Sequence, residues 1–503
     1  MTNGSNTGES AWRQQVRGAR KICHTLRRSS LGRIYRPVEL EISSNPLTSD
    51  AGLLPIRQLD QILRLTEQFA AALKDRRHPT LTTQSVLSMV RQRIYGILAD
   101  YEDQNDHDIL RHDPAFKLIA DRLPDGPDLA SQPTLSRFEN AVSIPDLWRL
   151  RDVLVDLFIQ SFDKPPRHLT LDIDAFDDPA HGQQQLIMFH GYYEQYQYLP
   201  IVVTCAENDM VLLVGLRHGT CDAFLGIDND LRYLMGKLRA VWPDVQVHVR
   251  GDSGLGVPLM YDVCQELRLS YTFGIGVNSR LQAMSDTLMT QTLEAYEKTG
   301  QTQRSFMLVD YQARSWPESQ PVVIKVEANP EGTNRRAVVT NRPGCRVLPY
   351  AIYDEYAMRG ESENRNKELK IELHAGRLSD HRFMANFFRL YLHAAALNLL
   401  VRLRRAVVAT VPTSAEVGEL AELPTEALDQ PARRKFFNER RRRDPLGEGF
   451  ACTWRTRLIK VAAEVITRCR RVIVKLSGSW PHLDQFLKVS QAVSRVRVAS
   501  SSP

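Results

Sequence analysis

Apolar residues recur at helical spacing through the first third of the chain. Leu53 to Leu73 shows this pattern, and so does Val86 to Ile97. A third apolar stripe follows Pro145, which stands where a helix begins. The pattern predicts an all-helical domain over residues 38–163. Before it, residues 1–37 form a polar, basic arm with too few apolar residues to pack by itself.

After Pro165 and Pro166 the apolar period changes to two. Leu169, Leu171 and Ile173 alternate with polar residues, which predicts a strand that carries Asp172 and Asp174 on its other face. The other elements predicted in this block are strands at Leu199–Cys205, Val211–Leu216, Val245–Val249 and Tyr271–Val277, and helices at Leu225–Trp242 and Pro258–Leu269. They predict an α/β mixed sheet over residues 164–279. Acids at its strand ends stand where open α/β sheets place their sites.

Short strand patterns then predict a β-rich insertion over residues 280–349. The strand candidates are Arg304–Val309, Val322–Val326 and Arg336–Thr340. Residues 350–407 return to the α/β core and end in a long apolar helix from Asp380, its expected N-cap, to about Val407. Residues 408–503 are low in strand signal and are predicted to form a basic, helical C-terminal region, with a disordered tail at its end.

Composition and charge narrow the class of protein. The 503 residues are 43% hydrophobic and 25% charged, as in soluble globular proteins. Seven cysteines without a C-x-x-C pair, and no apolar leader, indicate reduced thiols in the cytoplasm. The best membrane candidate, Phe383–Val401, contains Asn386, Arg389, His393 and Asn398, so we expect a buried core helix and no membrane partner.

The net charge of +6 is clustered. Arginines gather in Arg13–Arg36 and again in the stretch from Arg433 to Lys475, which includes Arg440 to Arg443. A run of charge by itself is usually a solvated surface. Together these residues favour an anionic partner, and we predict salt-sensitive DNA binding by the C-terminal stretch and DNA-end recognition by the helical domain through Arg137 and the arm.

The stretch Y-A-M-R-G-E-S-E-N-R-N-K-E-L-K places Tyr356, Arg359, Glu363 and Lys370 at spacings of 3, 4 and 7. On a helix all four would share one face. Such a face is either a solvated surface with ion pairs or the wall of a site for metal and phosphate. Gly360 suggests that the helix starts only near Glu361, with a turn before it.

Asp174, Asp252 and Glu363 complete a candidate site. Asp252 lies in the R-G-D-S-G turn after a predicted strand, and the three acids offer only oxygen ligands. Oxygen ligands suit Mg²⁺ or Mn²⁺, and two such ions can support in-line displacement at a phosphodiester. The pattern predicts phosphoryl transfer on nucleic acid. Asp172 remains an alternative first acid.

These residues resemble the DDE-type insertion-sequence transposases, which have an RNase H-like core. The family signature Y-x2-R-x3-E-x6-K is met by Tyr356, Arg359, Glu363 and Lys370. The strings L-D-I-D-A-F-D-D-P-A-H-G-Q-Q, F-H-G-Y-Y and R-G-D-S-G resemble the IS thirteen-eighty group. The resemblance covers roughly residues 38–475.

The resemblance implies the roles of the site residues. Asp174, Asp252 and Glu363 would be catalytic and hold two Mg²⁺ or Mn²⁺ ions, while Tyr356, Arg359 and Lys370 would contact DNA phosphates. The partners would be terminal inverted repeats and target DNA, bound by a homodimer on paired ends in the bacterial cytoplasm, associated with the nucleoid. Two other hypotheses stay open: a metal-dependent nuclease of the same fold, and an inactive DNA-binding relative.

One residue of the insertion has two interpretations. Trp316 could stack on a displaced base, or it could belong to the core of the insertion.

Overall fold

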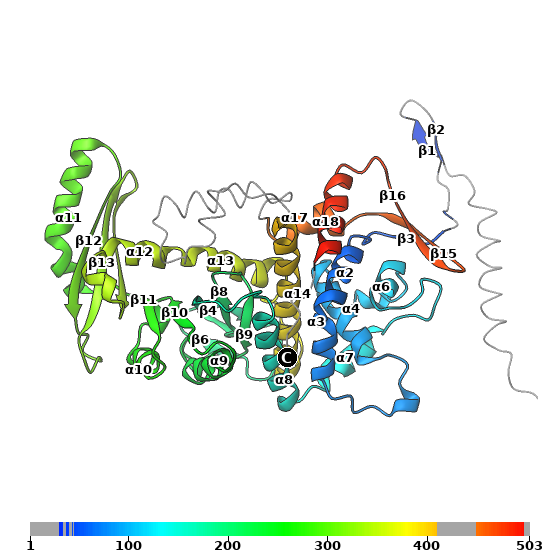
Figure 1. Ribbon diagram of the computed structural model, residues 1–503, viewed down its shortest axis with the longest axis horizontal. Helices are drawn as coiled ribbons and strands as arrows, with labels where there is room; N and C mark the ends of the chain where they lie inside the picture. Colours follow the sequence, from blue (N-terminus) through cyan, green and yellow to red (C-terminus); the bar gives the residue numbers. More distant parts are fainter. Residues whose placement is uncertain (1–29, 34–36, 40–42, 44, 410–448, 497–503) are drawn as a thin grey trace, which may run out of the picture.

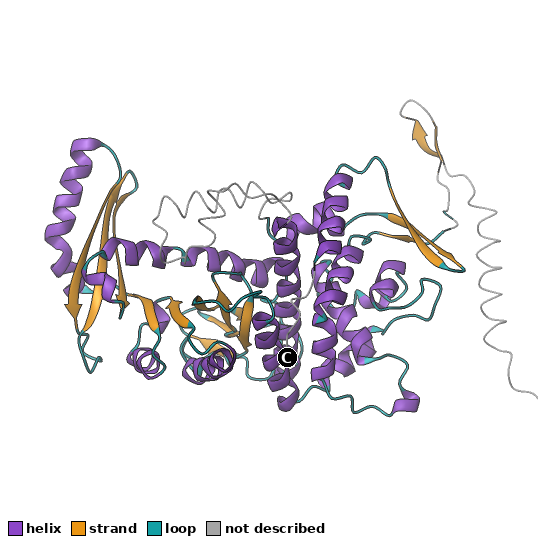
Figure 2. Ribbon diagram, in the orientation of Figure 1, coloured by secondary structure: helices purple, strands orange, loops and turns teal. Residues whose placement is uncertain are grey.

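The computed structural model describes residues 30–33, 37–39, 43, 45–409 and 449–496 (Figure 1). An eight-stranded sheet with the order β12-β13-β14-β11-β10-β4-β8-β9 forms its α/β part (Figure 2). The strands are β4 (His168–Ala175), β8 (Ile201–Cys205), β9 (Val211–Gly215), β10 (Gln246–Gly251), β11 (Ser270–Ile275), β12 (Gln303–Tyr311), β13 (Gln320–Asn329) and β14 (Gly332–Thr340). Strand β10 is parallel to β4 and β11, and the other pairs are antiparallel. The predicted mixed sheet is therefore confirmed.

The register of β4 follows from its alternating pattern. Leu169, Leu171 and Ile173 are buried in the main core, so Asp172 and Asp174 point to the opposite face of the sheet. Helices α9 (Ile227–Val241) and α10 (Pro258–Glu266) lie along one side of the sheet, and α12 (Pro349–Ala357) and α13 (Arg359–Lys367) run along the other (Figure 1). The two acids of β4 therefore lie on the side of α13, which packs against β4.

The N-terminal part is helical, as predicted. Its helices are α2 (Leu53–Leu63), α3 (Leu65–Ala72), α4 (Val86–Leu98), α5 (His107–Leu110), α6 (Pro114–Ile119), α7 (Gln132–Asn140) and α8 (Ile144–Ile159). The predicted Leu53–Leu73 helix is broken at Arg64, whose φ of 55° is left-handed. A capping box of Ser143 and Asp146 begins α8.

The long helix α14 (Phe383–Ala409) joins the helical part to the sheet. It packs against α2, α4, α7, α8 and β9 in one continuous core. By length and composition, Phe383–Val407 could cross a membrane, but 89% of its most apolar window is buried inside the protein, as expected for a core helix. Asp380 is not its N-cap, because the carboxylate accepts from the backbone N–H of Arg382 in a turn before the helix.

The stretch 280–349 differs from the predicted β-rich insertion. It begins with a 21-residue helix, α11 (Ser279–Thr299), which the sequence analysis missed. The three predicted strands are confirmed as β12, β13 and β14, but β14 pairs with β11, so they extend the main sheet. The buried face of α11 includes Ser285 and Thr292, and these polar residues interrupt the apolar pattern that would have predicted the helix.

Helix α12 (Pro349–Ala357) is followed at once by α13 (Arg359–Lys367) and then by a π-helical turn, η4 (Glu368–Glu372). Met358, a turn residue with helical φ and ψ, separates the two helices, so the predicted break is present, but α13 begins at Arg359, two residues before the predicted start near Glu361. A small core formed by Val323, Val338, Cys345, Ile352 and Tyr353 packs α12 against β13 and β14. The added strands thus fix the position of α12 and the helix that follows it.

The C-terminal region differs from the predicted helical one. Strands β15 (Ala463–Arg468) and β16 (Arg471–Leu476) form a hairpin that pairs with β3 (Leu47–Thr48) beside the N-terminal helices (Figure 1). Helices α17 (Ala451–Trp454) and α18 (Leu483–Arg495) flank it. The run Arg440–Arg443, most of the basic arm and the final tail lie outside the described residues, which include a small hairpin of β1 (Ser30–Arg33) and β2 (Pro37–Glu39).

A second small sheet lies next to β4. It has the order β5-β7-β6, with β5 (Asp178–Pro179), β6 (Met188–His190) and β7 (Gln195–Tyr198). The six cysteines in the described ranges are free thiols.

Candidate active site

Asp172 and Asp174 have different partners although both lie on β4. Arg250, on the neighbouring parallel strand β10, donates two hydrogen bonds of 2.7 Å to the Asp172 carboxylate and a third to the carbonyl of Glu355. Both side chains of the Arg250–Asp172 pair are buried. Asp172 is therefore neutralised inside the sheet. Asp174, nearer the end of the strand, faces the other two acids.

Asp252 follows β10 directly. Its Oδ1 accepts the backbone N–H of Gly254 at 2.9 Å and caps a short 3-10 turn, Ser253–Leu255. Close packing holds this turn against β11, since a Cβ on Gly274 would lie 2.7 Å from the Tyr356 hydroxyl and 3.3 Å from the Asp252 carbonyl carbon. Gly274 therefore lets Tyr356 approach the Asp252 backbone.

Arg359 lies between two of the predicted acids. Its Nη1 is 3.4 Å from Asp174 Oδ2, and its Nη2 donates to Glu363 one helical turn later. The Arg359 side chain is only 14% exposed. The charges of Asp174, Glu363 and Asp252 all act on this guanidinium and, against the effect of burial, raise its pKa. Arg359 therefore bridges Asp174 and Glu363, and Asp252 lies within electrostatic range of them without contacting the arginine.

The environment of Asp174 disfavours its ionised form. Burial is the largest effect and raises the pKa of this carboxyl to about 6, while Arg359 and a hydrogen bond from Asn366 act in the opposite direction. The negative charges of Asp252 and Glu363 add to the increase. A cation placed among these acids would favour the ionised carboxylate.

Tyr356 and Lys370, two of the predicted phosphate contacts, have different surroundings. Tyr356 lies at the site, where burial raises the pKa of its phenol and the charge of Arg359 opposes this. Lys370 instead pairs with Asp177, three residues after Asp174. Lys370 belongs to η4, and this π-helical turn changes the helical spacing on which a shared face with Glu363 depends.

Sequence reasoning missed several residues near the acids. Asn366, one turn after Glu363, donates to Asp174 Oδ2 at 2.9 Å. The Ser362 hydroxyl lies 2.8 Å from that of Thr204 and joins α13 to β8. Tyr193 lies within electrostatic range of Asp177 and Asp252. The spacing of Asn366 from Glu363 was a usable signal for Asn366, whereas nothing along the sequence links Tyr193 to the acids.

Other candidates have structural positions. Trp316 is buried and meets Tyr261 and Tyr311 edge-on, at ring-centroid distances of 5.2 and 5.5 Å, so it belongs to the core and is not placed to stack on a base. Asp178 is buried, and its carboxylate accepts a hydrogen bond from the backbone N–H of Leu378. Arg137 is exposed on α7.

The carboxylate oxygens of Asp174, Asp252 and Glu363 are the type of ligand that a hard divalent cation such as Mg²⁺ prefers. The described residues contain no group of three His, Cys, Asp or Glu side chains that is already placed to hold a metal ion. Arg359 occupies the space between Asp174 and Glu363 that such an ion would need. Asn366 Oδ1 is buried and has no hydrogen-bond partner among the described residues, so one more neutral oxygen is available there.

A mixed sheet that gathers three carboxylates beside a buried arginine is suited to chemistry on phosphates. The model of the family described as Transposase DDE domain group 1 matches residues 32–421, which is most of the chain, and the chain therefore belongs to this family. It is a DDE-type transposase, and this class implies DNA as the partner and generally uses divalent metal ions. No curated protein gives a significant match to the chain.

Proposed function

We propose that this transposase cleaves and joins DNA at a site formed by Asp174, Asp252 and Glu363. The observation that carries the proposal is that Arg359 bridges Asp174 and Glu363, while Asp252, at the end of the strand next to that of Asp174, lies within electrostatic range of both Asp174 and Arg359. Asp172 is excluded from this role in the proposal because Arg250 already neutralises it in the sheet. The choice between Asp172 and Asp174, open from the sequence, therefore favours Asp174.

The same acids would hold the cofactor. Asp174, Asp252 and Glu363, with Asn366 as an additional oxygen donor, suit two Mg²⁺ or Mn²⁺ ions. Bound divalent ions would supply an activated water or hydroxyl and stabilise the leaving oxygen. Arg359 would leave the carboxylates when cations replace it, and its guanidinium would then be available to a DNA phosphate.

The remaining signature residues would position the DNA. Tyr356 presents its hydroxyl beside the Asp252 turn, where it can donate to a phosphate oxygen. Lys370 is held by Asp177 on the chain that leaves Asp174, so its charge lies at the edge of the site. We assign Tyr356, Arg359 and Lys370 to phosphate contacts, as the Y-x2-R-x3-E-x6-K signature suggests.

We further infer an RNase H-like core within the IS thirteen-eighty group. Strands β9, β8 and β4 form an antiparallel meander, and β10 and β11 follow in parallel. The first acid lies on β4 and the second directly after the adjacent β10. These positions support the assignment, together with the strings that resemble the group.

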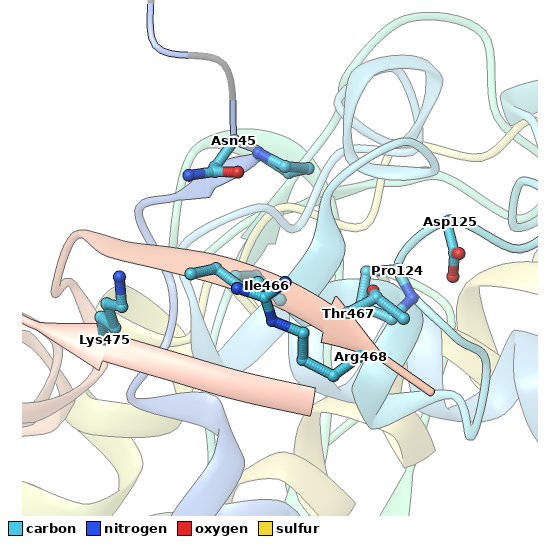
Figure 3. A pocket seen from close by; sticks show the side chains of 9 residues that line it. Asn45, Pro124, Asp125, Ile466, Thr467, Arg468 and Lys475 are labelled. Atoms are coloured by element: carbon cyan, nitrogen blue, oxygen red, sulfur yellow. The ribbon is translucent and has the colours of Figure 1, made fainter. Parts of the chain in front are cut away.

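The β15–β16 hairpin supports DNA binding by the C-terminal region. Arg468, Arg470 and Arg471 are exposed at its turn. A hollow of about 430 Å³ lies beside it, lined by Arg468 and Lys475 of the hairpin and by Pro124 and Asp125 of the helical domain (Figure 3). This hairpin is far from the acids, so we propose that it contacts the duplex of the element end away from the cleaved phosphodiester (Figure 1).

In this proposal the substrates are terminal inverted repeats and target DNA. A homodimer would hold two paired ends, and the protein would act in the bacterial cytoplasm at the nucleoid. The reaction would nick the element end to expose a 3′ hydroxyl and join that hydroxyl to target DNA.

A strand-transfer assay tests the function. The full-length protein is incubated with Mg²⁺, labelled end DNA and a supercoiled plasmid, and joined products are measured. Asp252→Ala and Glu363→Ala should abolish cleavage and joining while DNA binding stays nearly intact. Joining by either variant would refute the site. Cleavage without joining would favour a nuclease, and DNA binding without any Mg²⁺-dependent product would favour an inactive relative.

A further inference from the structure

An aromatic hairpin contacts the segment that follows the first acid, Asp174. It consists of β6, the loop Gly191–Glu194 and β7, and its small sheet starts at β5, four residues after Asp174. Gln195 donates to Asp177 Oδ2 at 3.2 Å, and Asp177 also binds Lys370. The hairpin is therefore joined directly to the strand that carries the first acid and to a proposed phosphate contact.

The base of this hairpin is firmly packed. Tyr198 is fully buried and its hydroxyl donates to the carbonyl of Gln185. A Cβ on Gly219 would lie 2.2 Å from the carbonyl oxygens of both Gln197 and Met188, so the loop after β9 rests against the hairpin backbone. A tip held in this way can present side chains in a fixed place at low entropic cost.

The tip of the hairpin carries one exposed tyrosine, Tyr192, and a half-buried one, Tyr193. Tyr192 is 84% exposed, and its ring centroid is 5.0 Å from that of Tyr193. The His190 ring, at the end of β6, has its centroid 5.0 Å from that of the Tyr193 ring. The hydrogen bond from Gln195 to Asp177 places this tip beside the segment that follows Asp174. Burial raises the pKa of the Tyr193 phenol, and the charges of Asp177, Asp252 and Asp174 add to the increase.

We propose that Tyr192 and Tyr193 form a stacking platform for an unpaired DNA base next to the cleaved phosphodiester. This assignment rests on the proposed function, because the acids fix where that phosphodiester must lie. The nucleotides on either side of it then pass over the hairpin tip. Every base has a π-face, so tyrosine rings hold an unstacked base whatever its identity.

The chemistry of the tip favours DNA over a protein partner. The rings at the tip carry hydroxyl and imidazole groups that can hydrogen-bond to bases and phosphates. The exposed Phe189 and Tyr196 pair with each other across the hairpin strands at a ring-centroid distance of 5.5 Å, on the face opposite the buried Gln197, and are not part of the tip loop. A protein interface at the tip would be seen as a change in oligomeric mass.

A cycle of protein and DNA changes tests the platform. Tyr192→Ala, Tyr193→Ala, Tyr192→Phe and Tyr193→Phe are compared with the unaltered protein on two end duplexes. One duplex is fully paired, and the other has an abasic nucleotide beside the mapped cleavage position. Affinity is measured in Ca²⁺ without turnover, and cleavage is measured in Mg²⁺. Trp148→Ala, which removes an exposed aromatic ring on α8, is the matched control.

If the tyrosines stack on a base, their removal should lower the affinity for DNA only when that base is present. The alanine variants should lose about 5- to 100-fold on the paired duplex and almost nothing on the abasic one, because no base remains to be held. The phenylalanine variants should keep most of the effect, and Trp148→Ala should change neither. An equal loss on both duplexes, or no loss on either, overturns the platform.

Two further outcomes separate this inference from the proposed function. If Asp252→Ala abolishes cleavage but the tyrosine variants bind both duplexes normally, the acids are right and the platform is wrong. If Asp252→Ala still cleaves, the proposed site itself fails. A lower oligomeric mass of Tyr192→Ala, with the ratio between paired and abasic duplexes unchanged, would assign the tip to a protein interface and overturn the proposal.

Discussion

Arg250 holds Asp172 with two hydrogen bonds of 2.7 Å inside the sheet, while Asp174, two residues further along the same strand, is left to face Asp252 and Glu363. Two carboxylates on one strand face thus have separate tasks. Asp172 completes a buried ion pair between neighbouring strands, and Asp174 belongs to the site.

This division predicts opposite results for two matched substitutions. Asp172→Asn should lower the free energy of unfolding by about 3 to 5 kcal/mol, because it leaves the buried Arg250 guanidinium without its counter-charge. Asp174→Asn should keep the stability, since its carboxylate is already disfavoured by burial, but should abolish cleavage. Urea unfolding and an end-cleavage assay measure the two effects. The assignment is wrong if Asp172→Asn folds normally and is inactive while Asp174→Asn remains active.

Arg359 should compete with divalent ions for the same carboxylates. Arg359→Gln removes the cation between Asp174 and Glu363, so the protein should bind Mn²⁺ more tightly, by roughly fivefold or more. The increase of Tm with Mn²⁺ concentration measures this affinity without turnover. Cleavage should nevertheless fall about 100- to 1,000-fold, because the phosphate contact is lost.

Lys370→Gln is the control for this competition. Its partner is Asp177, and it should leave the Mn²⁺ dependence of Tm nearly unchanged. Unaltered or weaker Mn²⁺ binding by Arg359→Gln would show that the arginine does not occupy the ion site.

The sequence predicted the acids more readily than their surroundings. Asp174 and Asp252 follow alternating apolar runs, and strand ends converge at a sheet edge, so their meeting with Glu363 was predictable. The position of Arg359 between Asp174 and Glu363 was not predictable, because it depends on the directions of side chains from separate elements of the fold. Lys370 pairs with Asp177 because it lies in the π-helical turn η4, and the spacing of the signature residues does not predict this turn.

The fold shows the same limit. Helix α11 was missed because Ser285 and Thr292 occupy part of its buried face, although its caps, Asn278 and Gly300, were visible in the sequence. The β15–β16 hairpin was missed because the interpretation of this stretch weighed its arginines above the β-branched run Val472–Val474. Tertiary pairing with β3 decides its conformation.

The arginines at the turn of the β15–β16 hairpin should contribute salt-dependent binding. Replacing Arg468, Arg470 and Arg471 with Gln should weaken binding to any duplex and reduce the slope of log K against log salt by up to about 0.9 for each residue. Titrations at several salt concentrations measure the slope. Arg232→Gln on α9, an exposed arginine paired with Asp228 and Glu266, is the control and should leave it unchanged. An unaltered slope in the triple variant would remove the hairpin from the DNA interface.

Glu139 should make the stability depend on acid pH. This residue of α7 is fully buried between Arg93 of α4 and Arg389 of α14. Burial opposes its ionisation, but the two arginines prevail and lower its pKa from 4.5 to about 2. Because the folded pKa is depressed, the stabilisation is complete above the unfolded pKa and is lost as the pH falls toward 2.

The measurement compares the free energy of unfolding of the unaltered protein and Glu139→Gln in urea. The difference between them should be constant above about pH 5.5 and should shrink by about 3 kcal/mol as the pH falls to 2. Glu266→Gln, which removes an exposed partner of Arg232, should show a much smaller trend: the hydrogen bond with Arg232 also lowers the pKa of Glu266, but water screens this exposed pair. A gap between unaltered protein and Glu139→Gln that does not vary with pH would mean that the arginines do not hold Glu139 ionised, and that α14 is joined to the helical domain by packing alone.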